Sequence, residues 1–142
     1  MTQIDFYFHV ENKLQTACKL SAKAVASGLR VFAFCPDGEI RRQLDRMLWT
    51  TPAIGFIPHC SPDHELAAVT PMIVDDAGSN LVHDQVLLNL RPELPEFFSR
   101  FQRLIEIVSI DEEDRRTARE RYKFYRDRGY EIRTHDLSQQ AQ

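Results

Sequence analysis

The first third of the chain alternates short apolar stretches with amphipathic ones, and this order limits the fold more than any other feature. Residues 4–9 alternate and are rich in aromatic side chains, which predicts a strand, while residues 14–25 carry apolar side chains at helical spacing. The short apolar run at 31–34 predicts a second, buried strand, and the spacing over 40–48 predicts a second helix. The chain therefore opens as strand, helix, strand, helix.

The same pattern continues beyond a stretch that is rich in proline. Further elements are expected as short strands at 55–57, 72–74, 85–90 and 104–108, a short helix near 96–103 and a last helix at 111–128. Strands that alternate with helices predict an α/β fold, here a three-layer sandwich with a mostly parallel central sheet.

The domain organisation follows from length and composition. A chain of 142 residues, 43% of them hydrophobic, can build one compact core without disulfides or metals. No linker or repeat divides it, so we expect a single domain over residues 1–136. Residues 137–142 end in polar side chains without a pattern, which predicts a mobile C-terminal tail.

Charge, cysteines and hydropathy exclude several classes of protein. A formal net charge of −3 argues against binding long nucleic acid by bulk charge, although a local basic patch remains compatible with it. Cys18, Cys35 and Cys60 are widely spaced and form no CxxC pair, so neither a disulfide framework nor a zinc ribbon is expected. Without a signal sequence at its start or an apolar run of about 18 residues, the chain is expected to be cytoplasmic.

The fold expected here resembles the Rossmann type, but its phosphate-binding loop is missing from the sequence. In nucleotide-binding folds, glycines in the first turn between strand and helix let a phosphate approach the backbone. Residues 9–13 contain no glycine, and neither GxGxxG nor GxxxxGK[ST] occurs in the chain. We expect no nucleotide or other cofactor.

Two groups of residues leave room for metal chemistry. Asp5, Asp75 and Asp76 follow or lie within predicted strands, and carboxylates that converge at strand ends can bind Mg²⁺ in nucleases and other phosphate-handling enzymes. The alternative is that Asp75 and Asp76 belong to an ordinary turn. The loop at 59–64 carries two histidines and a cysteine, but zinc sites usually have closer, paired ligands. For both groups we favour the interpretation in which the residues bind no metal.

The last predicted helix combines an acidic first turn with a basic remainder. Ser109 or Asp111 can cap its start. At about 100° per residue, one third of its circumference holds a basic and aromatic face made of Arg115, Arg119, Tyr122, Lys123 and Arg126. Periodicity alone allows three interpretations of this face: a solvated helix surface, a groove for carboxylates and one apolar side chain, or a platform for single-stranded DNA.

Two motifs in this chain resemble those of a known family. The segment 119–126, which reads RERYKFYR, is similar to a signature in the last helix of chi subunits of bacterial DNA polymerase III. The segment 44–49, which reads LDRMLW, precedes Pro52 and the sequence FIPH at 56–59, and resembles a second motif of that family. The resemblance covers about residues 4–133.

The resemblance implies a non-catalytic adaptor of the clamp-loader complex. Such a subunit bridges single-stranded DNA-binding protein, and through it single-stranded DNA, to the psi subunit of the clamp loader. By motif position, the acidic C-terminal tail of single-stranded DNA-binding protein, whose end resembles Asp-Asp-Ile-Pro-Phe, would bind at Arg115, Arg119, Tyr122, Lys123, Arg126 and Val108. A second surface at Trp49 and Phe56 would bind psi or, in some members, a helicase related to DNA repair.

Overall fold

The computed structural model describes residues 1–36, 38–50, 57–78 and 80–138. In chain order the elements are β1 (Gln3–Val10), α1 (Lys13–Ala26), β2 (Val31–Phe34), α2 (Glu39–Thr50), β3 (His59–Cys60), a 3₁₀ turn (Ala67–Val69), β4 (Met72–Asp75), β5 (Val86–Asn89), a second 3₁₀ turn (Phe98–Arg100), β6 (Arg103–Ser109), α3 (Glu112–Asp127) and β7 (Ile132–Asp136).

The described strands form one seven-stranded sheet in the order β3-β4-β2-β5-β6-β1-β7. Every pairing between neighbouring strands is parallel. The strands β2, β4 and β5 are completely buried, which explains why their sequences are continuous apolar runs and do not alternate. The prediction of an α/β fold with a parallel central sheet is confirmed.

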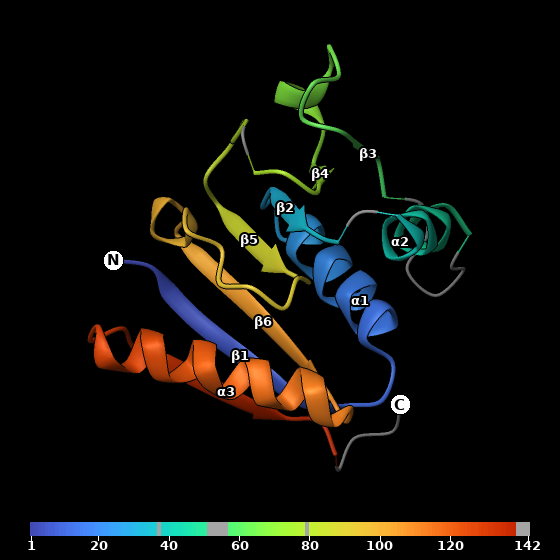
Figure 1. Ribbon diagram of the computed structural model, residues 1–142. Helices are drawn as coiled ribbons and strands as arrows, with labels where there is room; N and C mark the ends of the chain where they lie inside the picture. The colour runs from blue at the N-terminus through green and yellow to red at the C-terminus, as the bar shows by residue number, and fades with distance from the viewer. Residues whose placement is uncertain (37, 51–56, 79, 139–142) are drawn as a thin grey trace.

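Helices cover both faces of the sheet. In Figure 1, α3 crosses in front of β1 and β6, whereas α1 lies behind the sheet. One hydrophobic cluster joins α1 and α2 to one face and includes Cys18, Leu44 and Leu48. A second cluster joins α3 to the other face and includes Phe6, Ala118 and Tyr125. These layers make the sandwich that the sequence predicts.

Several details differ from the sequence-based expectations. The strands β3 and β7 were not predicted, because β3 has two residues and β7, with the sequence IRTHD, has no apolar run. The helix expected near 96–103 is only a 3₁₀ turn at Phe98–Arg100. Of the strand expected at 55–57, only Ile57 belongs to the described residues, and it lies outside any strand.

The C-terminal tail expected at 137–142 is described only for its first two residues, so its mobility stays a prediction. The amide of Leu137 donates a hydrogen bond to the carbonyl of Phe8, 3.0 Å away. Among the described residues, no helix has the length and apolar character needed to cross a membrane.

Candidate functional site

The start of α3 is held by a network of polar contacts. Asp111 caps the helix, because its carboxylate accepts a hydrogen bond from the amide of Asp114 at 3.1 Å. Asp114 in turn accepts from the amide of Ser109 at 2.8 Å and from Nζ of Lys13 on α1 at 3.0 Å. Burial raises the pKa of Asp114, but the charge of Lys13 and these hydrogen bonds outweigh it and lower that pKa overall. The helix therefore begins at a fixed place beside the end of β6.

A buried network holds the middle of α3 against the sheet. Nε of Arg121 lies 3.1 Å from both carboxylate oxygens of Glu106 on β6, and its Nη1 donates to the carbonyl of Pro92. Glu106 also accepts hydrogen bonds from the hydroxyl of Tyr125 at 2.8 Å and from the side chain of Asn89 at 3.1 Å. Burial raises the pKa of Glu106, while its partners oppose that shift. The sequence placed Arg121 in the basic run, yet its side chain is only 3% exposed.

A pocket of about 290 Å³ lies between α3 and three strands of the sheet, and we call it the α3 pocket. The aromatic ring of Phe6 meets that of Tyr122 edge to face, with centroids 5.3 Å apart. The strands supply Phe6, Phe8, His9, Val108, Ser109 and Thr134, and the helix supplies Arg115, Ala118, Arg119 and Tyr122. The pocket thus combines an apolar interior with two guanidinium groups.

Both arginines of the α3 pocket face one acidic side chain of their own helix. Nη1 of Arg115 lies 3.8 Å from Glu112, and Nη2 of Arg119 lies 3.6 Å from the other oxygen of the same carboxylate. The side chain of Glu112 is 79% exposed. Pairs that are this long and this exposed contribute roughly 0–1 kcal/mol, so another carboxylate can replace Glu112.

Of the six residues that the family resemblance assigned to tail binding, the structure brings four together in this pocket, namely Val108, Arg115, Arg119 and Tyr122. Lys123 and Arg126 do not line it. Arg126 lies one turn beyond Tyr122 on the same exposed face of α3, and Lys123 is exposed on the neighbouring side.

Apart from Val108, sequence reasoning missed the strand side of the α3 pocket. Phe6 and Phe8 occupy alternate positions in β1, so their side chains lie on the same face of the sheet. This spacing is visible in the sequence. The sequence does not show that this face packs against α3. The strand order shows it, because α3 connects β6 to β7 and β1 lies between these two strands.

The rim of the pocket at the end of β1 has an unusual backbone. His9 has a positive φ of 60°, and the pairing of β1 with β6 shifts register between Tyr7 and Val10. Nδ1 of His9 lies 2.8 Å from Oδ1 of Asp136 at the end of β7. Hydrogen bonds from Ser138 and His9 lower the pKa of Asp136 to about 2. These contacts join β1 to β7 beside the pocket.

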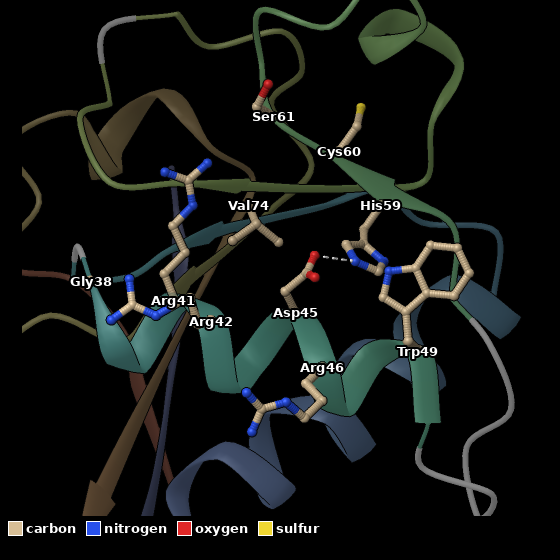
Figure 2. Close-up of a pocket in the computed structure, with 10 residues that line it drawn as sticks. All are labelled: Gly38, Arg41, Arg42, Asp45, Arg46, Trp49, His59, Cys60, Ser61 and Val74. Atoms are coloured by element: carbon tan, nitrogen blue, oxygen red, sulfur yellow. Dashed lines mark hydrogen bonds and ion pairs between the residues drawn. The ribbon is translucent and has the colours of Figure 1, made fainter.

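A larger hollow of about 750 Å³ lies at the other end of the sheet, beside α2, and we call it the Trp49 pocket. Figure 2 shows Asp45 and Trp49 from α2 turned toward His59 from β3, with Arg41 and Arg42 at the opposite end. Nε2 of His59 lies 2.7 Å from Asp45, and Nδ1 lies 2.7 Å from the carbonyl of Ile57. Contacts to protein oxygens at both nitrogens argue against a metal at this histidine.

Trp49 is 61% exposed, so its side chain is not part of the core. Phe56, which was expected to share this surface, lies outside the described residues. Arg41 pairs with Asp76 at 3.4 Å, and Arg42 pairs with Glu39 at 3.1 Å.

The carboxylates that were considered for a magnesium site are far apart. Asp5 lies on β1 and Asp75 on β4, four strand positions away in the sheet, which corresponds to roughly 19 Å. Asp5 is bound by Arg103 and His135, each at 2.9 Å, and Asp75 accepts a hydrogen bond from the amide of Gly78 at 2.7 Å, as in a turn. No group of three possible metal ligands occurs among the described residues. The geometry therefore contradicts the nuclease alternative.

Two of the cysteines lie in the core. Cys18 is 1% exposed and Cys35 is 0% exposed. Burial raises the pKa of each thiol to about 11, which disfavours a nucleophilic role.

Comparisons with known proteins agree on one family. The family model described as DNA polymerase III chi subunit, HolC, matches residues 1–133. The DNA polymerase III subunit chi of Pseudomonas aeruginosa is 34% identical over 141 residues, which cover 96% of this chain and 98% of that protein. The corresponding subunit of Haemophilus influenzae is 31% identical and covers 93% and 95%, and that of Escherichia coli K12 is 30% identical and covers 84% and 82%.

Proposed function

The chain belongs to the DNA polymerase III chi subunit family, and we propose that it is a non-catalytic adaptor whose α3 pocket receives the C-terminal tail of single-stranded DNA-binding protein. The tail expected from the family resemblance is acidic and ends in phenylalanine with a free carboxylate. Its chemistry is complementary to the α3 pocket in both charge and hydrophobicity. The adaptor acts in the cytoplasm, where unpaired thiols such as those of Cys18, Cys35 and Cys60 are stable.

The observation that carries the proposal is the pairing of an apolar cavity with arginines on its rim. Phe6, Val108 and Tyr122 offer apolar contacts to one aromatic ring. Arg115 and Arg119 can donate two hydrogen bonds each to carboxylates, a geometry that lysine cannot match. The cavity volume of about 290 Å³ is at the lower end of ligand pockets, which suits a single side chain.

The pocket needs little rearrangement to accept such a tail. Among the residues that the structure describes, Glu112 alone pairs with the two arginines, and its long, exposed ion pairs are weak. Because Asp111, Asp114 and Lys13 fix the start of α3, the arginines are carried on a rigid element. A tail carboxylate would replace Glu112 without moving the helix.

A second part of the proposal assigns the Trp49 pocket to the psi subunit or to a helicase. An exposed tryptophan beside arginines is typical of the centre of a protein interface. The α3 pocket is lined from β1, β6 and β7, whereas the Trp49 pocket is lined from β3, β4 and α2. The two pockets therefore lie at opposite ends of the sheet, and one protein can hold both partners at once.

A titration of the full-length chain with a labelled tail peptide tests the first part. We expect a dissociation constant that is roughly micromolar, equivalent to about 8 kcal/mol, because a short peptide buries little area and must become ordered. A matched peptide without the terminal phenylalanine should bind much more weakly, and added salt should weaken the binding of the intact peptide.

Equal binding of the two peptides would show that the apolar cavity is not the binding site. Direct binding to single-stranded DNA, the other open interpretation of the basic face, predicts instead a steep salt dependence for oligonucleotides without any tail present. Measuring oligonucleotides in the same assay distinguishes the two functions.

A further inference from the structure

A third pocket, of about 560 Å³, lies at the end of the sheet where β2 and β5 begin, and we call it the His83 pocket. It is lined by Arg30, Arg100 and the segment 81–85. Arg30 directly precedes β2, and the segment 81–85 directly precedes β5, which is a neighbour of β2 in the sheet. Arg100 ends the 3₁₀ turn that Figure 1 shows in orange just before β6. Three parts of the chain that are far apart in sequence therefore meet here.

The His83 pocket is separate from the two pockets described above. Among the described lining residues, none is shared with the α3 pocket or with the Trp49 pocket. In nucleotide-binding folds the phosphate lies at the carboxyl ends of the strands, beside a loop rich in glycine. Because this pocket lies where the strands begin, the missing glycine loop does not bear on what it can bind.

The ring of His83 lies among aromatic side chains, with both of its nitrogens buried. Its centroid is 6.0 Å from that of Phe32 and 6.5 Å from that of Phe101, and both contacts are edge to face. Neither Nδ1 nor Nε2 has a hydrogen-bond partner among the described residues. Buried polar atoms in folded proteins nearly always have a partner, since leaving one unpaired is unfavourable. A ligand in the pocket would supply it.

The surroundings of His83 keep its imidazole neutral near pH 7. Burial lowers the pKa of the ring, and the charge of Arg30 lowers it further. The charge of Asp84 opposes this shift, as does the backbone of Val31, which lies near the ring without the geometry of a hydrogen bond. A neutral imidazole has one N–H that donates and one nitrogen that accepts. The ligand that suits it best therefore offers both an acceptor and a donor.

Two guanidinium groups make the pocket basic. Neither Arg30 nor Arg100 forms an ion pair with an acid in the described part of the chain. Oε1 of Gln85 accepts a hydrogen bond from the amide of Arg30 at 2.6 Å, which leaves the side-chain NH₂ of Gln85 to donate. Asp84 is the single acid among the described lining residues, so the positive charges exceed the negative ones. The pocket thus has the charge and the donors to bind an anion.

We propose that the His83 pocket binds a terminal phosphate group, such as that of inorganic phosphate or of a phosphate monoester. Each guanidinium can donate two parallel hydrogen bonds to phosphate oxygens. A carboxylate has two oxygens, which one guanidinium satisfies, so the second guanidinium and the imidazole would stay unmatched. A terminal phosphate near neutral pH has a third oxygen, and in its monoanionic form a hydroxyl that donates to the accepting nitrogen of His83. Phosphates within a DNA strand have no such hydroxyl, and the net charge of −3 disfavours binding of long nucleic acid.

The test is a titration of the isotopically labelled full-length chain with inorganic phosphate at constant ionic strength. It follows the ring resonances of the five histidines by NMR. Those of His83 should shift to saturation with a dissociation constant of roughly 1 mM or tighter. Sodium acetate at the same ionic strength should not shift them. A response of His83 that does not saturate, or one that acetate reproduces, would overturn the proposal.

Variants of the arginines keep His83 as the reporter. Arg30→Gln and Arg100→Gln should each weaken phosphate binding by about five-fold or more, because each removes one guanidinium. The control Arg128→Gln, at an exposed position after α3, should change it by less than about two-fold. Phosphate affinities that are the same in all three variants would contradict the site. Should one pocket variant fail to fold, the other still decides.

A comparison of two ligands distinguishes the sources of phosphate. A nucleoside monophosphate should reproduce the shift of the His83 resonances. An oligonucleotide without terminal phosphates should not do so at the same phosphate concentration. If the oligonucleotide binds more tightly and this binding is weakened by Arg30→Gln, the pocket holds the DNA backbone, and the proposal of a terminal phosphate is wrong.

Discussion

Arg121 and Glu106 form an ion pair in the interior of the protein, with Nε 3.1 Å from Oε1 and the two side chains 3% and 0% exposed. The pair joins α3 to β6, and Tyr125 and Asn89 add hydrogen bonds to the same carboxylate. Charged groups this deeply buried are costly unless they are matched. The position of α3, and with it the α3 pocket, depends on keeping them together.

Arg121→Met should therefore destabilise the fold by roughly 3–5 kcal/mol, because it leaves Glu106 buried without its cation. The free energy of unfolding in urea measures this change. The double variant Arg121→Met with Glu106→Leu removes both charges and should recover part of the loss. A loss of less than about 1 kcal/mol in the single variant would contradict the structural role of the pair.

Asp5 should make the stability of the fold depend on acid pH. Burial raises the pKa of its carboxyl, but hydrogen bonds from His135 and Arg103, with the charge of Arg103, lower the pKa overall below its ordinary value. A carboxyl whose pKa is lower in the folded state stabilises the fold above its unfolded pKa, and this stabilisation is lost as the pH falls through the folded pKa.

Asp5→Asn should thus be less stable than the native chain at pH 7, and the difference should shrink as the pH is lowered from about 5 to about 3. At the lower pH the native carboxyl is itself increasingly protonated. Urea unfolding of both proteins at several pH values gives the comparison. A stability difference that stays constant over this range would contradict the role given to the ion pair of Asp5 and Arg103.

Trp49→Ala should separate the two proposed binding surfaces. Its side chain is 61% exposed, so the change should cost less than about 1 kcal/mol of stability. Binding of the tail peptide should not change, because the α3 pocket lies at the other end of the sheet. Capture of purified psi subunit should be lost, whereas Arg119→Ala should retain it. Loss of tail binding in Trp49→Ala would mean that the two surfaces are not independent.

The sequence contains enough information for the layers of the fold but not for the order of its strands. The buried strands β2, β4 and β5 can be recognised in the sequence as apolar runs. The start of α3 can be recognised from its cap, Asp111, and from the acidic residues that follow it. The edge strand β7 is polar, with three of its five residues exposed, so it has no apolar run by which it could be recognised.

Apart from Val108, which the family resemblance supplied, the candidate site was predictable on its helix side only. The spacing of Arg115, Arg119 and Tyr122 predicts a shared face, and the structure has one. Arg121 lies in the same basic run, and only the presence of Glu106 on the facing strand explains why it is buried. Contacts between residues so far apart in the chain depend on tertiary packing, which periodicity does not encode.

One matched pair of variants shows whether the guanidinium groups of the α3 pocket bind the tail. Arg119 lines the pocket, whereas Arg116 is exposed on the same helix outside it and pairs with Glu120 at 2.9 Å. Both substitutions to alanine should leave the free energy of unfolding within about 0.5 kcal/mol of the native value. In calorimetric titrations with the tail peptide, Arg119→Ala should weaken binding by about ten-fold and Arg116→Ala by less than about two-fold. Equal affinities for the two variants would contradict the claim.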